Sequence, residues 1–300
     1  TYYIKEDHKT LKEIRNEAEK ELQDEGKDVA LPTYDARKKE ATEEDPFLLF
    51  VISDADGRVI RKIKKEIEAG VHRLVWDFRA GPVGPISLDS GGDYVPWDTP
   101  EQGYMVPPGV YRVAMYTYDD GVLSQLGEAQ DLSCKPLNDA GLSAADREAL
   151  DTFNRKVAEL SRAISSADAH RKHLQKSLPY LDRAILGSSG LDESGLAELS
   201  AIRTQLREID EKLNGDHLLV MEEGQARMSL KGRTDLIISA LWSTTSGSTG
   251  TFERAYQEAK DGFGEVLVAL RQVDARIGSL EDELEGAGAP YTPGRLPVWE

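Results

Sequence analysis

The spacing of apolar residues changes once along the chain, between residues 135 and 142, and this change limits the fold more than any other feature of the sequence. Before it, short apolar runs alternate with period two, which is typical of β-strands. After it, apolar residues recur every three or four positions, which is typical of amphipathic helices. Pro136 interrupts both patterns, and 300 residues exceed what one core usually covers. We therefore expect two domains, at 1–135 and 143–300.

The first domain shows the pattern of a small all-β fold. Turn sequences rich in Gly, Pro and Asp separate short apolar runs, beginning with the hairpin turn at 54–57 (DADG). Six or seven short strands joined in this way predict an immunoglobulin-like β-sandwich, without its disulfide. The predicted strands cover residues 1–5, 47–53, 59–63, 70–79, 110–118, 122–126 and 129–134.

Residues 70–79 (GVHRLVWDFR) are the central strand of this prediction. Leu74, Trp76 and Phe78 alternate with charged residues and valines, so one face is apolar and the other is exposed. Trp76 is the largest side chain of the apolar face, and for a buried aromatic of this size we expect replacement by alanine to cost about 3 to 5 kcal/mol.

An insertion at about 6–45 interrupts the predicted strands. Its first part, 9–25, has the apolar spacing of one helix face at Leu11, Ile14, Ala18 and Leu22. A second short helix is expected at 34–41. The insertion is otherwise charged.

The apolar spacing of the second domain predicts an up-and-down helical bundle. Ser143 is a suitable helix N-cap, and apolar residues then continue at helical spacing to Ile185, with a kink expected near Pro179. Further helices are expected at 196–213, 233–242 and 256–284, and residues 214–231 show no clear pattern. Together with the first domain this gives an α+β multidomain protein, a β-sandwich followed by an α-helical bundle.

The extended tail at 286–300 follows the last helix and contains three prolines. We expect it to fold back over the sandwich or the junction of the domains, with Arg295 paired to a carboxylate or to carbonyls at a helix C-terminus.

Composition excludes several classes of partner and site. The formal charge is −17 and no basic stripe is present, which argues against nucleic acid or an anionic membrane. No apolar run is long enough for a membrane span. Cys134 is the single cysteine, so neither an intrachain disulfide nor a thiolate metal cluster can form.

The loop at 80–106 carries the main binding candidates of the sequence. It contains several prolines and glycines, and long loops in compact domains are often functional. Three loop aromatics form the candidate platform for a glycan or a peptide, namely Tyr94, Trp97 and Tyr104. Trp76 is the alternative platform residue, although its place on the strand favours the core.

The sequence signals for metal sites and for catalysis are weak. Oxygen ligands for Ca²⁺ could come from Asp89, Asp93 and Asp98, but their spacing does not match an EF-hand and a solvated turn is the competing interpretation. His170 and His173 have a helical metal spacing without a third ligand, and exposed histidines are the simpler interpretation. No other cofactor is indicated. No catalytic motif or carboxylate pair is evident, so we expect no catalysis within this chain alone.

Three stretches of the chain resemble a known family. They are residues 70–79, residues 106–112 (VPPGVYR) and residues 288–299 (GAPYTPGRLPVW). The chain resembles the C-terminal region of large exported bacterial proteins with sortilin-like or BNR repeats, which are described as putative glycosyl hydrolases. The first two stretches also resemble the immunoglobulin-like domain of flagellar hook-capping proteins.

The resemblance implies N-terminal β-propeller domains in the same polypeptide and an exported protein in the periplasm, at the outer membrane or outside the cell. Because the chain starts at Thr1, we expect it to be a fragment. The resemblance implies a noncatalytic accessory module that scaffolds or binds. Two alternatives stay open: a module that completes the active site of a propeller hydrolase, and a glycan or peptide binding module that uses loop 80–106.

Overall fold

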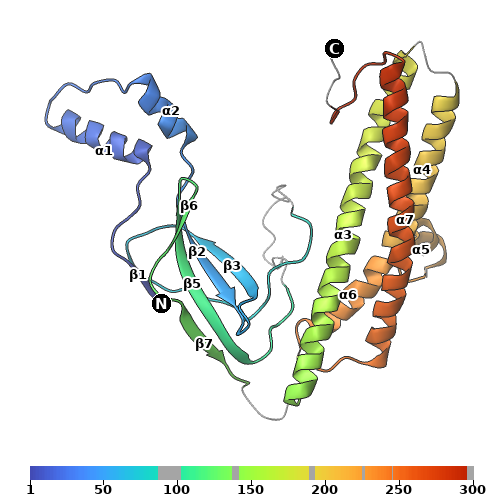
Figure 1. The fold of residues 1–300 in the computed structure, drawn as a ribbon, viewed down its shortest axis with the longest axis horizontal. Coiled ribbons are helices and arrows are strands. Elements are labelled where there is room, and N and C mark those ends of the chain that lie inside the picture. Colours follow the sequence, from blue (N-terminus) through green and yellow to red (C-terminus); the bar gives the residue numbers. More distant parts are fainter. Residues whose placement is uncertain (87–102, 137–141, 189–192, 225–226, 245, 296–300) are drawn as a thin grey trace. The chain divides into compact units, whose positions relative to one another are not determined.

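The protein has a mixed α and β fold in the computed structural model (Figure 1). The structure describes residues 1–86, 103–136, 142–188, 193–224, 227–244 and 246–295. The chain divides into two compact units. Thr1–Gly81 and Val106–Asp139 form the first, which we call the sheet unit, and Pro82–Met105 and Ala140–Glu300 form the second, the helical unit. The described residues 82–86 and 103–105 thus group with the helices, although the sequence assigns them to the first domain.

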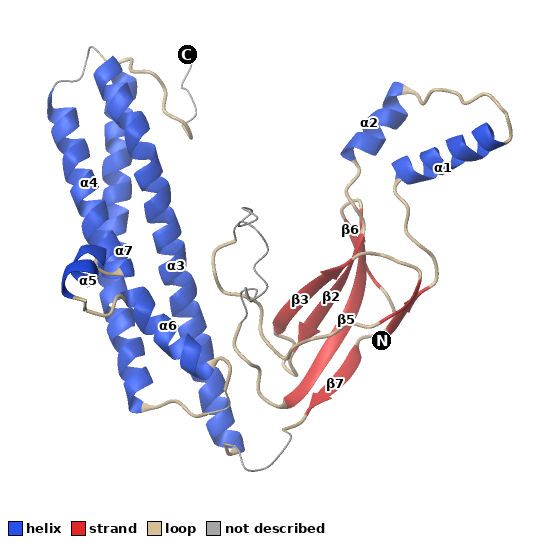
Figure 2. Ribbon diagram, turned by 180° about the vertical axis from the view of Figure 1, so that it is seen from behind, coloured by secondary structure: helices blue, strands red, loops and turns tan. Residues whose placement is uncertain are grey.

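A five-stranded antiparallel sheet is the main layer of the sheet unit (Figure 2). Its order is β3-β2-β5-β6, and β7 pairs with the same edge of β5 as β6 does, further along that strand. Leu48, Phe50 and Ile52 alternate along β2 and are buried, which confirms the period-two prediction for this strand. The bounds are β2 Phe47–Ser53, β3 Val59–Lys65, β5 Gly109–Asp119, β6 Val122–Gln125 and β7 Gln130–Cys134.

The second layer of the sheet unit is a pair of short strands, β1 (Tyr2–Ile4) and β4 (Gly70–His72). It packs on the apolar face of the larger sheet, where Ile4 shares a core with Leu48 and Phe50. Two strands cover only part of a sheet of five. The inner face of the larger sheet is therefore left partly open.

The predicted strand at 70–79 is wrong beyond His72. β4 has three residues, because its only partner among the described strands is the equally short β1. The chain then continues without a ladder, and Phe78 adopts a left-handed φ of 56° that no regular strand allows. The predicted alternation nevertheless holds, since Leu74 and Trp76 are half-buried and Val75 is exposed.

Two helices form the insertion, α1 (Leu11–Asp24) and α2 (Tyr34–Thr42), as predicted. Thr10 and Glu13 form a capping box at the start of α1. Arg15 pairs with Glu19 within α1 and with Glu40 of α2, and the second of these ion pairs joins the two helices. The expected apolar face of α1 is formed but not covered, since Leu11 and Ile14 are exposed.

Long helices dominate the helical unit (Figure 1). The apolar stripes predicted for α3, α4 and α7 meet in one continuous core, which contains residues such as Leu181, Leu199 and Val273. Ser143 caps α3 as expected, and α3 runs through Pro179 to its end. Sequence periodicity missed α5. The bounds are α3 Ala144–Gly187, α4 Glu193–Asn214, α5 His217–Glu223, α6 Leu230–Leu241 and α7 Gly250–Gly286. None of the described helices has both the length and the apolar character that a membrane crossing requires.

The tail after α7 folds back on the helical unit. Arg295 donates a hydrogen bond to the carbonyl of Glu281 and forms ion pairs with Asp282 and Glu285. The predicted pairing of Arg295 with carboxylates and helix carbonyls is confirmed. The sequence predicts a position over the sandwich or the junction of the domains, and the contacts of the tail in the structure are with the helical unit: Ala289 packs on the helical core and Pro290 lies beside Gly187.

Candidate functional site

Most of the site residues predicted from the sequence lie outside the described residues. They are Tyr94 and Trp97 of the aromatic platform, and the calcium candidates Asp89, Asp93 and Asp98. Tyr104 is described and is only 7% exposed, with its ring edge-to-face against Trp242 at a centroid distance of 6.0 Å. Tyr104 therefore belongs to the packing of the helical unit, which does not suit the exposed platform that the sequence predicts.

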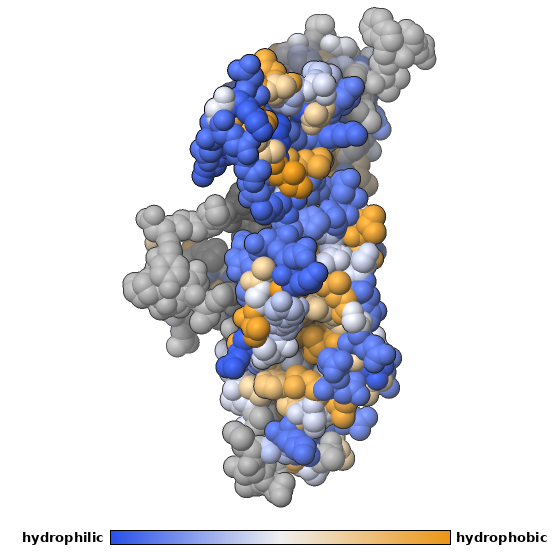
Figure 3. Space-filling model, turned by 90° about the vertical axis from the view of Figure 1, so that its left-hand side faces the viewer, coloured by the Kyte–Doolittle hydropathy of each residue, from blue (hydrophilic) through white to orange (hydrophobic). Residues whose placement is uncertain are grey.

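The sheet unit contains a groove of about 600 Å³ where its second layer leaves the larger sheet uncovered. We call it the sheet groove. Figure 3 shows apolar side chains, in orange, among the hydrophilic surface of this unit. The lining is largely apolar and aromatic, and consists of Thr1, Tyr2, Tyr3, Phe50, Ile52, Leu74, Val75, Trp76, Phe78, Val113, Met115, Leu126, Glu128, Gln130, Asp131 and Leu132.

The floor of the sheet groove is the inner face of β2 and β5. Phe50 pairs with Met115 and Ile52 with Val113, so all four side chains point to the same side of the sheet. Phe50 and Ile52 are buried, while the β5 residues are half-buried. The floor is rigid because it belongs to the best-paired strands of the unit.

Two stretches of chain form the walls. On one side, Gln130, Asp131 and Leu132 of β7 line the groove consecutively. On the other side, residues 74–76 do the same. Side chains of a strand alternate between faces, so three consecutive lining residues indicate that the groove runs along the backbone itself rather than along one face.

The polar atoms of Trp76 in the groove and of Tyr111 beside it are bonded to the protein's own backbone. The Trp76 ring lies between Phe78 and Tyr111, and its Nε1 donates to the carbonyl of Arg79 at 2.9 Å. The Tyr111 hydroxyl donates to the carbonyl of Pro107. Burial, followed by the nearby charge of Glu68, raises the pKa of Tyr2 above its usual value. These contacts leave ring faces and aliphatic groups as the main surface of the groove.

Both charged side chains in the lining are acidic. Glu128 is exposed and has no ion pair among the described residues, whereas Asp131 pairs with Arg112 at 3.1 Å. The lining itself contains neither Lys nor Arg. Asp131 lies opposite Arg112 in the β5–β7 ladder, so its side chain is on the other face of the sheet from Val113 of the floor. The sheet groove thus combines an apolar floor with one acidic side chain, Glu128, at its rim.

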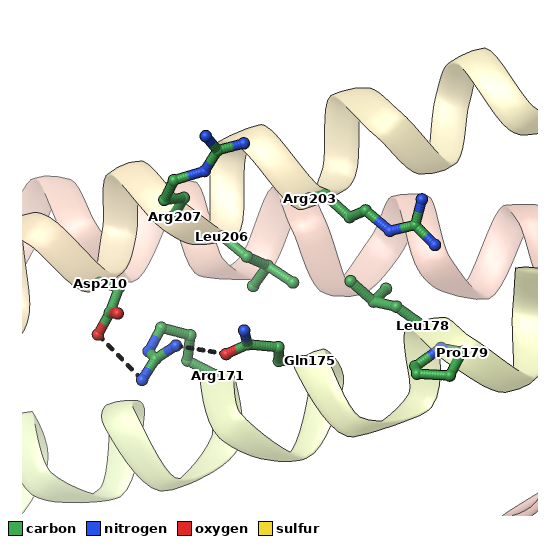
Figure 4. Close-up of a pocket in the computed structure, with 8 residues that line it drawn as sticks. All are labelled: Arg171, Gln175, Leu178, Pro179, Arg203, Leu206, Arg207 and Asp210. Atoms are coloured by element: carbon green, nitrogen blue, oxygen red, sulfur yellow. Dashed lines mark hydrogen bonds and ion pairs between the residues drawn. The ribbon is translucent and has the colours of Figure 1, made fainter.

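A second hollow, of about 380 Å³, lies between α3 and α4 in the helical unit (Figure 4). Its central residue is the buried Arg171, which binds Asp168 at 2.8 Å, Asp210 at 3.0 Å and Gln175 at 2.9 Å. Every one of these bonds is internal to the protein. We interpret this hollow as the outer surface of a structural ion-pair network.

The histidine pair on α3 lies on the surface. His170 is 3.0 Å from Asp274, and the rings of His170 and His173 stack with centroids 6.3 Å apart. Within the described part of the chain, no three His, Cys, Asp or Glu side chains form a group that would hold a metal ion.

Sequence analysis missed the sheet groove as a site. Trp76, for which the sequence leaves core and platform open, is half-buried, packs against the cluster around Ile52 and also lines the sheet groove. A signal was present in β2, whose sequence FLLFVIS is apolar without interruption and needs cover on both faces. The shortness of the second layer carries no sequence signal.

Comparisons with protein-family models, curated proteins and solved structures found no match to this chain.

Proposed function

We propose that this chain is a noncatalytic binding and scaffolding module, and that the sheet groove is its contact surface. The observation that carries the proposal is the sheet groove itself. It has a volume of about 600 Å³, its floor is apolar and aromatic, and the acidic side chain of Glu128 lies at its rim. Concave apolar surfaces of this size typically serve binding. The polar atoms of Trp76 and Tyr111 are bonded to the protein's own backbone, so they support architecture rather than proton transfer.

We further infer that the sheet unit is an immunoglobulin-like sandwich whose second layer is reduced to β1 and β4. The antiparallel strands and the core shared by Ile4 and Phe50 support this inference. In the same way, the common core of α3, α4 and α7 supports an up-and-down bundle for the helical unit.

The wider setting of the proposal is an exported bacterial protein in which β-propeller domains precede this module. Its support is the resemblance of residues 70–79, 106–112 and 288–299 to the C-terminal region of sortilin-like and BNR-repeat proteins. In that setting the sheet groove would hold a segment of the neighbouring domain or of a partner. Completion of a propeller active site by loop 80–106 is the competing enzyme function.

A glycan is the second candidate ligand. Tyr3 is 64% exposed and Phe78 is 39% exposed, and both rings line the sheet groove beside Trp76. Exposed ring faces of this kind stack on the apolar faces of sugars as well as on peptide side chains.

Binding arrays test the proposal directly. The chain is applied to a peptide array and a glycan array, and the same is done with Leu132→Ser, which removes apolar surface from the groove. The matched control is Leu123→Ser, since Leu123 is also an exposed leucine on an edge strand but does not line the groove. We expect binding that Leu132→Ser weakens and Leu123→Ser leaves unchanged.

Two results would contradict this function. One is the absence of any ligand on both arrays. The other is hydrolysis of a glycoside by the chain together with its propeller domains that is lost when residues 80–106 are removed, which favours the enzyme function instead.

A further inference from the structure

The two edges of the five-stranded sheet differ in how they are protected. The outer strand on one side, β3, carries Arg61, Lys62, Lys64 and Lys65, and charged residues of this kind discourage further strand pairing. The outer strand on the other side, β7, has the sequence QDLSC without a Lys, Arg or Pro. Among the described strands β7 pairs with β5 alone. Its second edge has no strand partner within the described ranges, and we call it the open edge of β7.

The sheet groove follows this open edge. Gln130, Asp131 and Leu132 border it consecutively, so the backbone of β7 faces the groove and not only its side chains. Across the groove, residues 73–77 lie in no strand of the described structure, while the carbonyl of Phe78 accepts a hydrogen bond from the backbone N–H of Val106. The open edge of β7 thus borders one side of the apolar floor. This is the arrangement into which a strand can be added.

The dimensions suit a short segment. Five residues of β7 correspond to about 16 Å of extended chain at about 3.3 Å per residue. A strand added at this edge would become the next strand of the larger sheet, beside β7. Its side chains on the groove side would lie beside Gln130 and Leu132, which share that side of the sheet with Val113 and Tyr111.

The charge at the rim of the groove favours some extended segments over others, according to their own charge. Glu128 and Asp131 are the charged residues of the lining, and Glu128 has no ion pair in the described part of the chain. A basic side chain near Glu128 would gain from this rim, and an acidic one would be repelled.

We propose that the sheet groove binds an extended polypeptide segment that pairs backbone to backbone with the open edge of β7. The segment places alternate apolar side chains beside Leu132, on the groove side of the sheet, and a basic side chain near Glu128. This inference rests on the proposed binding function and names its partner, a neutral to basic segment with alternating apolar residues.

The test uses a labelled heptapeptide of alternating valine and threonine with a lysine near each end, and fluorescence anisotropy with the 300-residue chain. Two further peptides are N-methylated at the odd or the even residues, which removes backbone donors and keeps the side chains. Strand pairing predicts that at least one N-methylated peptide binds about tenfold more weakly or worse. A peptide with glutamate in place of lysine should also bind more weakly.

Variants of the chain locate the bound peptide. Leu132→Ser should weaken binding of the lysine peptide, whereas Leu123→Ser should not. Glu128→Gln should weaken the lysine peptide by about threefold and leave a peptide without charges unaffected. Thermal unfolding of each variant establishes that the sheet unit is folded.

The possible outcomes distinguish strand pairing with β7 from the more general proposal that the sheet groove binds a ligand. If both N-methylated peptides bind as tightly as the parent while Leu132→Ser weakens all three, strand pairing is wrong and groove binding stands. The same holds if glycans alone bind. Dimerisation of the chain that a proline in β7 abolishes would make a second copy the occupant and overturn the inference. If neither peptides nor glycans bind, the proposed function fails as well.

Discussion

The helical unit and the sheet unit differ in how completely each covers its apolar surface. In the helical unit, the stripes of α3, α4 and α7 meet in one continuous core that follows the helices. In the sheet unit, the buried residues form two small clusters, one around Phe50 and one around Ile52. The helical unit thus gathers its apolar stripes in one core, whereas the sheet unit leaves part of the apolar face of its larger sheet uncovered in the sheet groove.

This difference in the coverage of apolar surface follows from the partners that helices and sheets have for packing. A long amphipathic helix finds a stripe of equal length on its neighbours, so little apolar area remains exposed. The face of a five-stranded sheet needs a layer of similar area, and β1 and β4 supply six residues. The continuous core of the helical unit favours stability, and the partly uncovered sheet of the sheet unit favours binding.

The largest effect is expected for Leu199→Ala. Leu199 is fully buried in the helical core, and such a truncation costs about 3 to 5 kcal/mol. Chemical denaturation followed by circular dichroism measures it. Leu132→Ala in the sheet groove is the comparison, with an expected cost below about 1 kcal/mol. Equal losses would mean that the two units do not differ in this way.

The pH dependence of the helical unit is the next largest effect. Burial raises the pKa of Asp168, but hydrogen bonds from Lys172, Asn214 and Arg171 to the carboxylate outweigh burial, and the pKa lies below its usual value. The ionised form is thus favoured by folding. Its contribution is complete above the unfolded pKa of about 3.9 and is lost as the pH falls through the folded pKa.

Denaturant midpoints between pH 6 and pH 2 measure this loss. Asp168→Asn should destabilise the helical unit at pH 6 by about 3 kcal/mol, because Arg171 loses a buried partner. It should also flatten the pH dependence below pH 4. A variant with the slope of the parent would show that Asp168 is not its source.

Replacement of Trp76 sharpens the description of the sheet unit. The sequence predicts a cost of about 3 to 5 kcal/mol for Trp76→Ala, as for a fully buried ring. Because the ring is half-buried between Tyr111 and Phe78, we expect about 2 kcal/mol. Intrinsic fluorescence and denaturation provide the value, with Val75→Ala, an exposed neighbour, as the control.

The smallest effect concerns the tail of the helical unit. Deletion of residues 289–300 removes the packing of Ala289 and the bonds of Arg295, and should lower the melting temperature by about 2 to 6 °C. Arg295→Ala should account for only part of this shift. An unchanged melting temperature would mean that the tail contributes nothing to the fold.

Elements with a strong local pattern were predictable from the sequence. The apolar run of β2, the cap at Ser143 and the apolar stripe of α7 each indicate the secondary structure that forms there. Elements without such a pattern were not. α5 is short and unpatterned, and the end of β4 at His72 depends on the length of its partner β1.

The site shows the same limit. The sequence directed attention to loop aromatics, yet Tyr104 is packed against Trp242. The groove residues Tyr3, Phe78 and Leu132 come from three separate segments, and none of them belongs to a motif. An alternating pattern reports which face of a strand is apolar, but it does not report how much of that face is covered.

Periodicity and capping chemistry by themselves determined that a β-rich half precedes a helical half, because they act within a few residues of each other along the chain. The tertiary structure alone decided that the second layer has two strands, that β7 keeps an open edge and that the tail docks on α7. The physical reason is that the cover of an apolar face depends on how much apolar area distant segments of the chain bring to it. No local sequence pattern reports that area.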